Sequence, residues 1–150
     1  MASMTNAFET NLMLLLFNND ALTNVGNAGG LLATSADGST QLSLHTTALT
    51  DASTLMTTNQ IAYTGYARPT QPRDATATGW DVTSGAATNK GIISFQEMTG
   101  GAGGTAVHVG LGFIATGDQL DLHADLTADL AVTAGITPQF AISALSWTAA

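Results

Sequence analysis

The feature of this sequence that most restricts its fold is a long alternation of apolar with small or polar residues over positions 105–132. A turn at 116–118 divides the alternation into two runs. The apolar positions are Val107, Val109, Leu111, Phe113, Leu120, Leu122, Ala124, Leu126, Ala128 and Leu130. Successive side chains of a β-strand point to opposite faces. The alternation therefore predicts an antiparallel hairpin with one face inward and one outward. Leu111, Phe113, Leu122 and Leu126 are then expected in the core.

A single helix is expected at residues 6–18, before the first strand. Phe8, Leu12, Leu15 and Leu16 share one helical face, and Asn6 three residues before Glu9 is typical of a helix start. The run from Leu12 to Phe17 is apolar on more than one face, so such a helix needs cover from a loop or a neighbouring subunit. This predicts an oligomer interface, whose candidate residues are Leu12, Leu14, Leu16 and Phe17.

Short strand-like segments separated by Gly, Pro and Asn follow the helix. They lie at 41–46, 61–68, 79–83, 92–95, 105–113, 120–130, 140–142 and 145–147, with a further short one at 31–33. Many short strands with such turns favour a β-sandwich or barrel. We therefore predict a mainly β, jelly-roll-like antiparallel sandwich with one N-terminal helix. The predicted single domain spans residues 1–150, with its strands at about 31–148.

The charge composition excludes several functions. Of the 150 residues, 9% are charged, and three Lys and Arg stand against eleven Asp and Glu, giving a net charge of −8. Binding to nucleic acid or to an anionic membrane needs a basic surface that this chain lacks. With no cysteine there is no disulfide framework, Cys-ligated zinc or thiol nucleophile. The apolar run at 12–17 is too short for a transmembrane helix and lacks the flanks of a signal peptide. Met1 and Met4 are both possible starts.

One polar row on the predicted hairpin is a candidate site. Asp121, His123, Asp125 and Asp129 share a strand face, and carboxylates with a histidine are typical metal ligands. Neighbours along such a row are about 7 Å apart, so one strand cannot enclose a metal ion. We therefore expect a solvated outer face, no metal and no cofactor, with Asp121, His123 and Asp125 the weak candidates. His108 and His123 are expected to approach one another across the hairpin, and His45 to be structural.

No other pattern indicates catalysis. There is no nucleophile-elbow motif, and the glycine-rich segment 100–104 has neither the lysine nor the following helix of a phosphate loop. We therefore predict that the protein is not an enzyme. Arg68 and Arg73 either bind an acidic partner or pair with the chain's own carboxylates, and the second is favoured. Tyr63, Tyr66 and Trp80 either stack on a sugar or belong to the core or an interface.

Several segments in order resemble a known family. They are Leu42-Ser43-Leu44-His45-Thr46, Tyr63-Thr64-Gly65-Tyr66-Ala67-Arg68, Gly79-Trp80, Asn89 to Phe95, Thr99-Gly100, Val107-His108-Val109-Gly110, Gly117-Asp118-Gln119-Leu120, Leu126-Thr127-Ala128 and Gly135-Ile136-Thr137-Pro138-Gln139-Phe140. The succession resembles small tailed-phage virion proteins that are labelled tail-fibre-like and whose β-sandwich is similar to that of capsid cement, or decoration, proteins. One departure is Thr47-Ala48-Leu49-Thr50, where members often carry an Asp-Pro turn.

The resemblance implies a structural role on a virus particle. The leading hypothesis is a cement protein that binds the outside of the major capsid protein shell and reinforces it. The alternative is a tail-fibre or tail-tip module that contributes to recognition of a host-surface glycan. In either case we expect a homo-oligomer, with a trimer favoured over a dimer. The resemblance supplies no catalytic residue.

Overall fold

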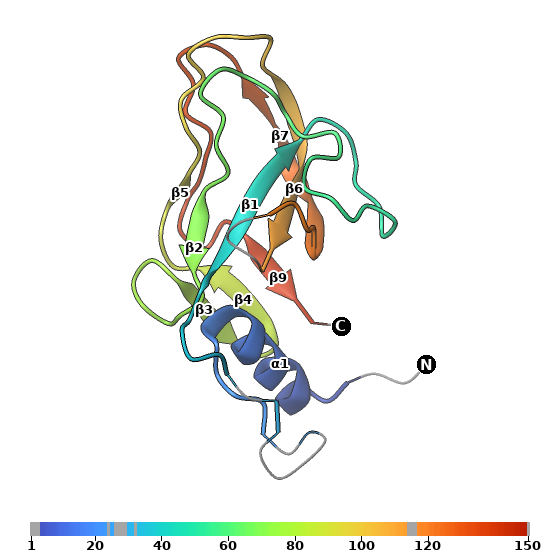
Figure 1. Ribbon diagram of the computed structural model, residues 1–150, viewed down its shortest axis with the longest axis vertical. Helices are drawn as coiled ribbons and strands as arrows, with labels where there is room; N and C mark the ends of the chain where they lie inside the picture. The colour runs from blue at the N-terminus through green and yellow to red at the C-terminus, as the bar shows by residue number, and fades with distance from the viewer. Residues whose placement is uncertain (1–3, 24, 26–29, 32, 114–116, 150) are drawn as a thin grey trace. The chain divides into compact units, whose positions relative to one another are not determined.

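The computed structural model describes residues 4–149 except 24, 26–29, 32 and 114–116 (Figure 1). It confirms a mainly β chain with antiparallel sheets and one N-terminal helix. The elements are α1 (Asn6–Asn18), β1 (Ser39–His45), β2 (Thr70–Pro72), β3 (Trp80–Thr83), β4 (Ala86–Asn89), β5 (Ile93–Ser94), β6 (Gly104–Gly112), β7 (Leu122–Val132), β8 (Gln139–Phe140) and β9 (Ser146–Thr148). No helix in these described ranges is long and apolar enough to cross a membrane.

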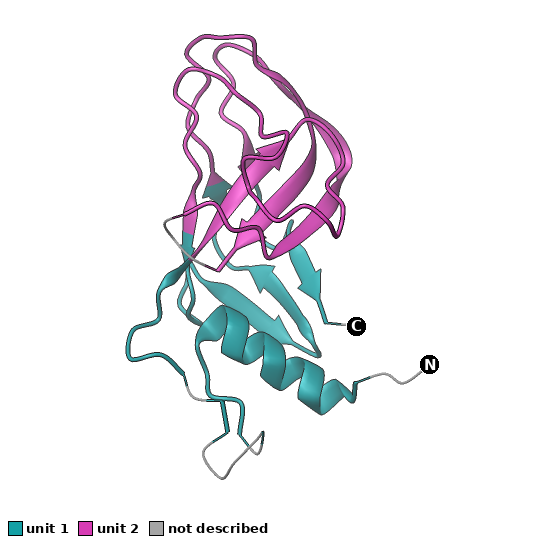
Figure 2. Cartoon of the chain, turned by 45° about the vertical axis from the view of Figure 1, so that its right-hand side comes forward, with its two compact units in different colours: residues 1–39, 71–93, 140–150 teal, residues 40–70, 94–139 magenta. Residues whose placement is uncertain are grey.

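The chain forms two compact units, each built from separated segments (Figure 2). Unit 1 comprises residues 1–39, 71–93 and 140–150, and unit 2 comprises residues 40–70 and 94–139. The strand orders are β2-β1-β6-β7, β3-β4-β9 and β5-β8. Unit 1 therefore holds α1 with the three-stranded sheet, and unit 2 holds most of the four-stranded sheet. The sandwich arrangement and the single-domain organisation stay predictions.

Helix α1 begins and ends where its sequence supplies capping groups. The hydroxyl of Thr5, rather than Asn6, accepts a hydrogen bond from the Phe8 N–H at 3.4 Å, as an N-cap does. Asn19 ends the helix in the left-handed conformation, with φ of 57°. The Arg73 guanidinium donates to the carbonyls of Leu15 and Leu16, at 2.8 and 2.6 Å. Those carbonyls lack partners within a helix, so Arg73 is a C-terminal cap rather than a site for an anion.

The buried face of α1 differs from the face predicted. Met13 and Phe17 are buried, while Phe8 is exposed. The leucines of the helix, at positions 12, 14, 15 and 16, are half-buried. Phe17 meets Trp80 of β3 edge to face, with ring centroids 4.8 Å apart. Because the helix is apolar on several sides, its sequence alone did not determine which side packs on β3 and β4.

In unit 2, β1 and β6 pair antiparallel with Leu42 opposite Leu111 and Leu44 opposite Val109. All four are at most 1% exposed and form the apolar face of this sheet. Strand β7 pairs with β6 on the other side, but the register shifts between Ala106 and His108. The shift interrupts the regular alternation expected along β7. Strand β7 is also the edge strand of the sheet. Leu122 and Leu126 are half-buried rather than core, and Phe113 is half-buried too.

Other predicted elements differ in extent. Residues 61–68 do not form the strand predicted there, because their backbone makes only one isolated β-bridge, between Thr64 and Gly100. Strand β4 was not predicted. It follows the turn Ser84-Gly85, whose two positive φ values suit a tight hairpin. The strand predicted at 31–33 lies partly outside the described residues, and its Leu31 makes an isolated bridge with Leu22. The turn predicted at 116–118 also lies partly outside them.

Candidate functional site

The second face of the β1–β6–β7 sheet is polar, yet much of it is buried. Register places His45 opposite His108, Ser43 opposite Gly110, and Gly110 opposite His123. Ser43 and His45 are 0% exposed and His108 is 4% exposed. The buried part of this face lies on β1 and β6. In the β7 row predicted to be a solvated outer face, Asp125 and Asp129 are exposed, and Asp121 and His123 are half-buried.

His45 is held by hydrogen bonds at both ring nitrogens. Nδ1 lies 2.7 Å from the Thr58 carbonyl oxygen, and Nε2 lies 2.7 Å from the Ser43 hydroxyl oxygen. A carbonyl only accepts, so Nδ1 carries the hydrogen, and in the neutral ring Ser43 donates to Nε2. Burial lowers the pKa of His45, and the nearby His108, Arg68 and His123 act in the same direction against the Thr58 carbonyl. This is a neutral structural histidine, as expected from the sequence.

His108 and His123 approach one another as predicted. Their rings are stacked with centroids 6.0 Å apart. His108 Nδ1 lies 2.9 Å from a carboxylate oxygen of Asp125, and His123 Nε2 lies 3.5 Å from a carboxylate oxygen of Asp51. The stacked pair thus connects β6, β7 and the loop that follows β1.

The three weak metal candidates have separate partners. Asp121 accepts hydrogen bonds from the Phe113 N–H at 2.7 Å and from the Gln119 side chain. His123 faces Asp51, and Asp125 faces His108. Among the residues that the structure describes, no group of three or more His, Cys, Asp or Glu could hold a metal ion.

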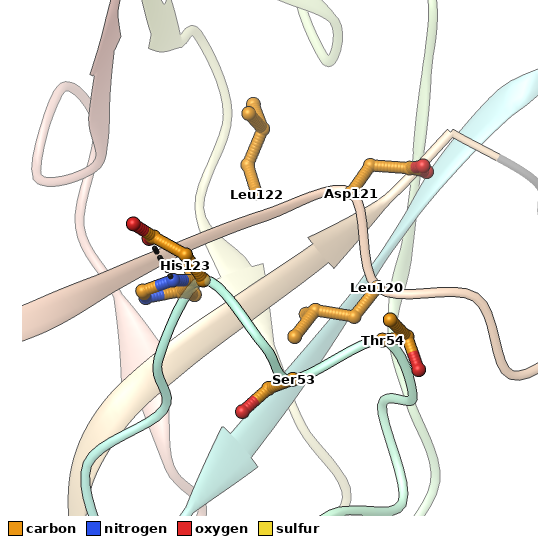
Figure 3. A pocket seen from close by; sticks show the side chains of 7 residues that line it. Ser53, Thr54, Leu120, Asp121, Leu122 and His123 are labelled. Carbon is orange, nitrogen blue, oxygen red and sulfur yellow. Dashed lines mark ion pairs between the residues drawn. The ribbon is translucent and has the colours of Figure 1, made fainter.

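A hollow opens where the loop after β1 meets the start of β7 (Figure 3). Its volume is about 460 Å³, and its lining residues are Asp51, Ser53, Thr54, Leu120, Asp121, Leu122 and His123. In Figure 3 the Leu120 side chain extends toward the loop, whereas the Leu122 side chain points away to the other side of β7. The hollow therefore combines hydroxyls and a carboxylate on one wall with an apolar patch and an imidazole on the other.

The loop that carries Asp51, Ser53 and Thr54 is held against residues 118–120 by backbone hydrogen bonds. The Leu120 N–H donates to the Thr54 carbonyl at 3.0 Å, and the Met56 N–H donates to the Asp118 carbonyl at 2.8 Å. Beneath them Leu49, Met56 and Leu120 form a buried apolar cluster. The wall is therefore preorganised, which lowers the entropic cost of binding a ligand there.

Arg68 braces the next part of the same region. Its guanidinium donates to a carboxylate oxygen of Asp118 at 2.7 Å, to the Gly117 carbonyl at 3.0 Å and to the Gln60 amide oxygen at 3.2 Å. Although burial would raise the pKa of Asp118, hydrogen bonds from the Thr57 hydroxyl and from Arg68 lower it overall. The favoured sequence interpretation of Arg68, a pair with one of the chain's own carboxylates, is confirmed.

The aromatic residues considered as sugar platforms do not line this hollow. Trp80 is 0% exposed and Tyr63 is 9% exposed. Tyr63 and Tyr66 pack edge to face with centroids 5.2 Å apart, and the Tyr66 hydroxyl accepts from the Leu44 N–H at 3.1 Å. Sequence reasoning missed Asp51, Ser53 and Thr54, because nothing in a Thr- and Ser-rich connection shows that it folds back over the sheet.

The apolar helix residues are not equivalent. Phe17 is fully buried on Trp80 and is a core residue of unit 1. Leu12, Leu14 and Leu16 are half-buried. These three leucines remain candidates for an oligomer interface.

Comparison with known protein families finds a match. The family described as "Podophage GP4 fiber I protein gp80" matches residues 3–148, nearly the whole chain. No curated protein matches the sequence.

Proposed function

The chain belongs to the Podophage GP4 fiber I protein gp80 family of phage tail fibre proteins, and we propose that within the fibre it contributes to recognition of a host-surface glycan. Members of this family are structural components of the virion and not enzymes. The match supports the tail-fibre alternative. It favours this alternative over the capsid cement hypothesis, which placed the protein on the capsid exterior. The observation that carries the glycan proposal is the polar hollow between the Asp51 loop and β7.

The chemistry of the hollow suits a sugar. Asp51 presents an exposed carboxylate that can accept hydrogen bonds from neighbouring hydroxyls, and Ser53 and Thr54 add hydroxyls beside it. Leu120 is 8% exposed, so it adds only a small apolar area to the lining for the C–H face of a sugar ring. A volume of about 460 Å³ falls in the range of small-ligand sites and would accommodate part of an oligosaccharide. The hollow is open to solvent, which suits a glycan that remains attached to a cell surface.

Binding of the purified protein to a glycan array and to host cells tests this proposal. Asp51→Ala removes the exposed acceptor, and Thr54→Trp fills the hollow. Both should lose most of the binding while their circular dichroism and melting temperature stay close to wild type. Asp129→Ala, an exposed aspartate of β7 outside the hollow, is the matched control and should bind normally. Normal binding by Thr54→Trp would place recognition elsewhere.

We further propose a homo-oligomer, with a trimer favoured over a dimer. The support is that Leu12, Leu14 and Leu16 of α1 are only half-buried, since stable interfaces are apolar. Light scattering should give a mass near three chains at micromolar concentration. Leu12→Glu with Leu14→Glu should dissociate the oligomer, and a stable wild-type monomer would contradict it.

The position on the particle separates the fibre from the capsid hypothesis. A fibre protein is present at the low copy number that tail symmetry dictates, whereas a protein that binds the major capsid protein follows the many symmetry axes of a shell. Quantitative gel analysis of purified virions, with gold-labelled antibody to this chain, should find few copies and label the tail. Hundreds of copies distributed over the head would restore the cement hypothesis.

A further inference from the structure

We infer that the glycan taken by the hollow is neutral or amine-bearing, and that sugars carrying carboxylate, phosphate or sulfate are rejected. This inference rests on the proposed function and concerns the charge of its ligand. It follows from the charges that line the hollow and from the positions of every cation in the chain.

The charged groups at the hollow are mainly acidic. The Asp51 side chain is fully exposed, and Asp121 is half-buried on the opposite wall. His123 is the one basic side chain in the lining, and its Nε2 already faces the Asp51 carboxylate at 3.5 Å. An incoming anion would therefore meet the exposed Asp51 carboxylate and no cationic side chain free of a carboxylate.

No permanent cation of the chain is left to compensate. The sequence has three, all of them in the described part of the chain. Arg68 donates to Asp118 and neighbouring carbonyl and amide oxygens, and Arg73 donates to the last carbonyls of α1. Lys90 donates to the Ala75 carbonyl at 2.6 Å. None of the three lines the hollow, so an acidic glycan bound there has no arginine or lysine beside it, and the net charge of −8 repels it at longer range.

The expected discrimination is modest, because Asp51 is solvated. A like charge about 4 Å away in water-like surroundings weakens binding about fivefold. An amine at the same place would gain a similar factor. Both effects should decrease as salt is added, since screening acts strongly on exposed charges. Binding of a neutral sugar should not respond to salt.

The experiment is a glycan array that carries each sugar in matched neutral, amine-bearing and acid-bearing forms, read at low and at high salt. The strongest signals should come from neutral and amine-bearing glycans, with acid-bearing counterparts about fivefold weaker at low salt. High salt and Asp51→Asn should each narrow this gap, while Asp129→Asn should leave it unchanged.

The outcomes separate the two proposals. If an acid-bearing glycan binds best in the wild type, and Thr54→Trp abolishes that binding, the hollow is a glycan site but the charge inference is wrong. If neutral glycans bind better but Asp51→Asn does not reduce their advantage over acid-bearing glycans, the discrimination does not come from this carboxylate and the inference is also wrong. If no glycan binds at all, the proposed function fails and the inference falls with it.

Discussion

The two faces of the β1–β6–β7 sheet are made by alternate residues of the same strands, yet one is apolar and the other is polar and hydrogen-bonded. On one face Leu42, Leu44, Val109 and Leu111 are buried and carry no polar side-chain atom. On the other, Ser43 and His45 are equally buried but hydrogen-bonded, under a loop that also forms the hollow. A burial pattern alone would not distinguish these faces. Their hydrogen-bonding groups do.

The difference predicts how each face responds to its surroundings. Burial of apolar side chains stabilises by an amount that does not depend on pH. A buried polar group needs every one of its partners, and a buried histidine links stability to protons. The apolar face should therefore set the stability of unit 2, and the polar face should make that stability sensitive to pH and to small steric changes.

The largest effect is expected on the apolar face. Leu44→Ala removes a fully buried side chain and leaves a cavity, which costs about 2–5 kcal/mol of unfolding free energy. Urea denaturation at pH 8 and again near pH 5 measures the cost, and the difference between variant and wild type should be the same at both. A cost that changes with pH would show that the two faces are not independent.

A smaller loss is expected from overfilling the polar face. A Cβ at Gly110 would lie 2.6 Å from Leu120 Cδ1, 2.7 Å from Ser43 Oγ and 2.8 Å from His45 Nε2. Gly110→Ala should therefore disrupt the Ser43–His45 pair and cost about 1–3 kcal/mol. Gly100→Ala is the matched control, since its Cβ would meet nothing closer than Thr64 Oγ1 at 3.5 Å. Equal stability of the two variants would mean that the polar face is loosely packed.

The third prediction concerns protons on the polar face. Because burial lowers the pKa of His45 below its ordinary 6.5, the unfolded chain binds a proton that the folded chain does not. Stability from this group is therefore fully present above pH 6.5 and is lost as pH falls below it, by up to about 1.4 kcal/mol per pH unit until the folded pKa is reached. His45→Gln removes the titration and should flatten that slope, even though it lowers stability at every pH. An unchanged slope would assign the acid sensitivity to other groups.

These contrasts also explain what the sequence could and could not predict. Period and turn residues were enough for α1, β1, β3 and β6, because in those segments the local pattern and the tertiary contacts agree. The alternation at 120–130 predicted the right strand but the wrong burial, since the alternation of one strand does not show that the strand lies at the edge of its sheet. The approach of His108 to His123 followed from hairpin geometry. The position of the loop after β1 could not be predicted, because it depends on the contacts of Leu49 and Met56 with Leu120.

The last and smallest prediction compares two aspartates that the alternation treats as equivalent. Asp121 and Asp129 both belong to the acidic row that the sequence predicts to be a solvated outer face. On such a face, replacing Asp by Asn usually costs little. In the structure, Asp121 accepts from the Phe113 N–H at 2.7 Å and from Gln119, and so closes the end of the β6–β7 hairpin, whereas Asp129 is exposed. An asparagine has a single acceptor oxygen and cannot keep both bonds. Asp121→Asn should therefore cost about 1 kcal/mol, and Asp129→Asn should leave the urea midpoint unchanged. If both variants match wild type, the carboxylate of Asp121 is not a strut of the hairpin, and the wall of the hollow that it lines is held by the backbone of β7 alone.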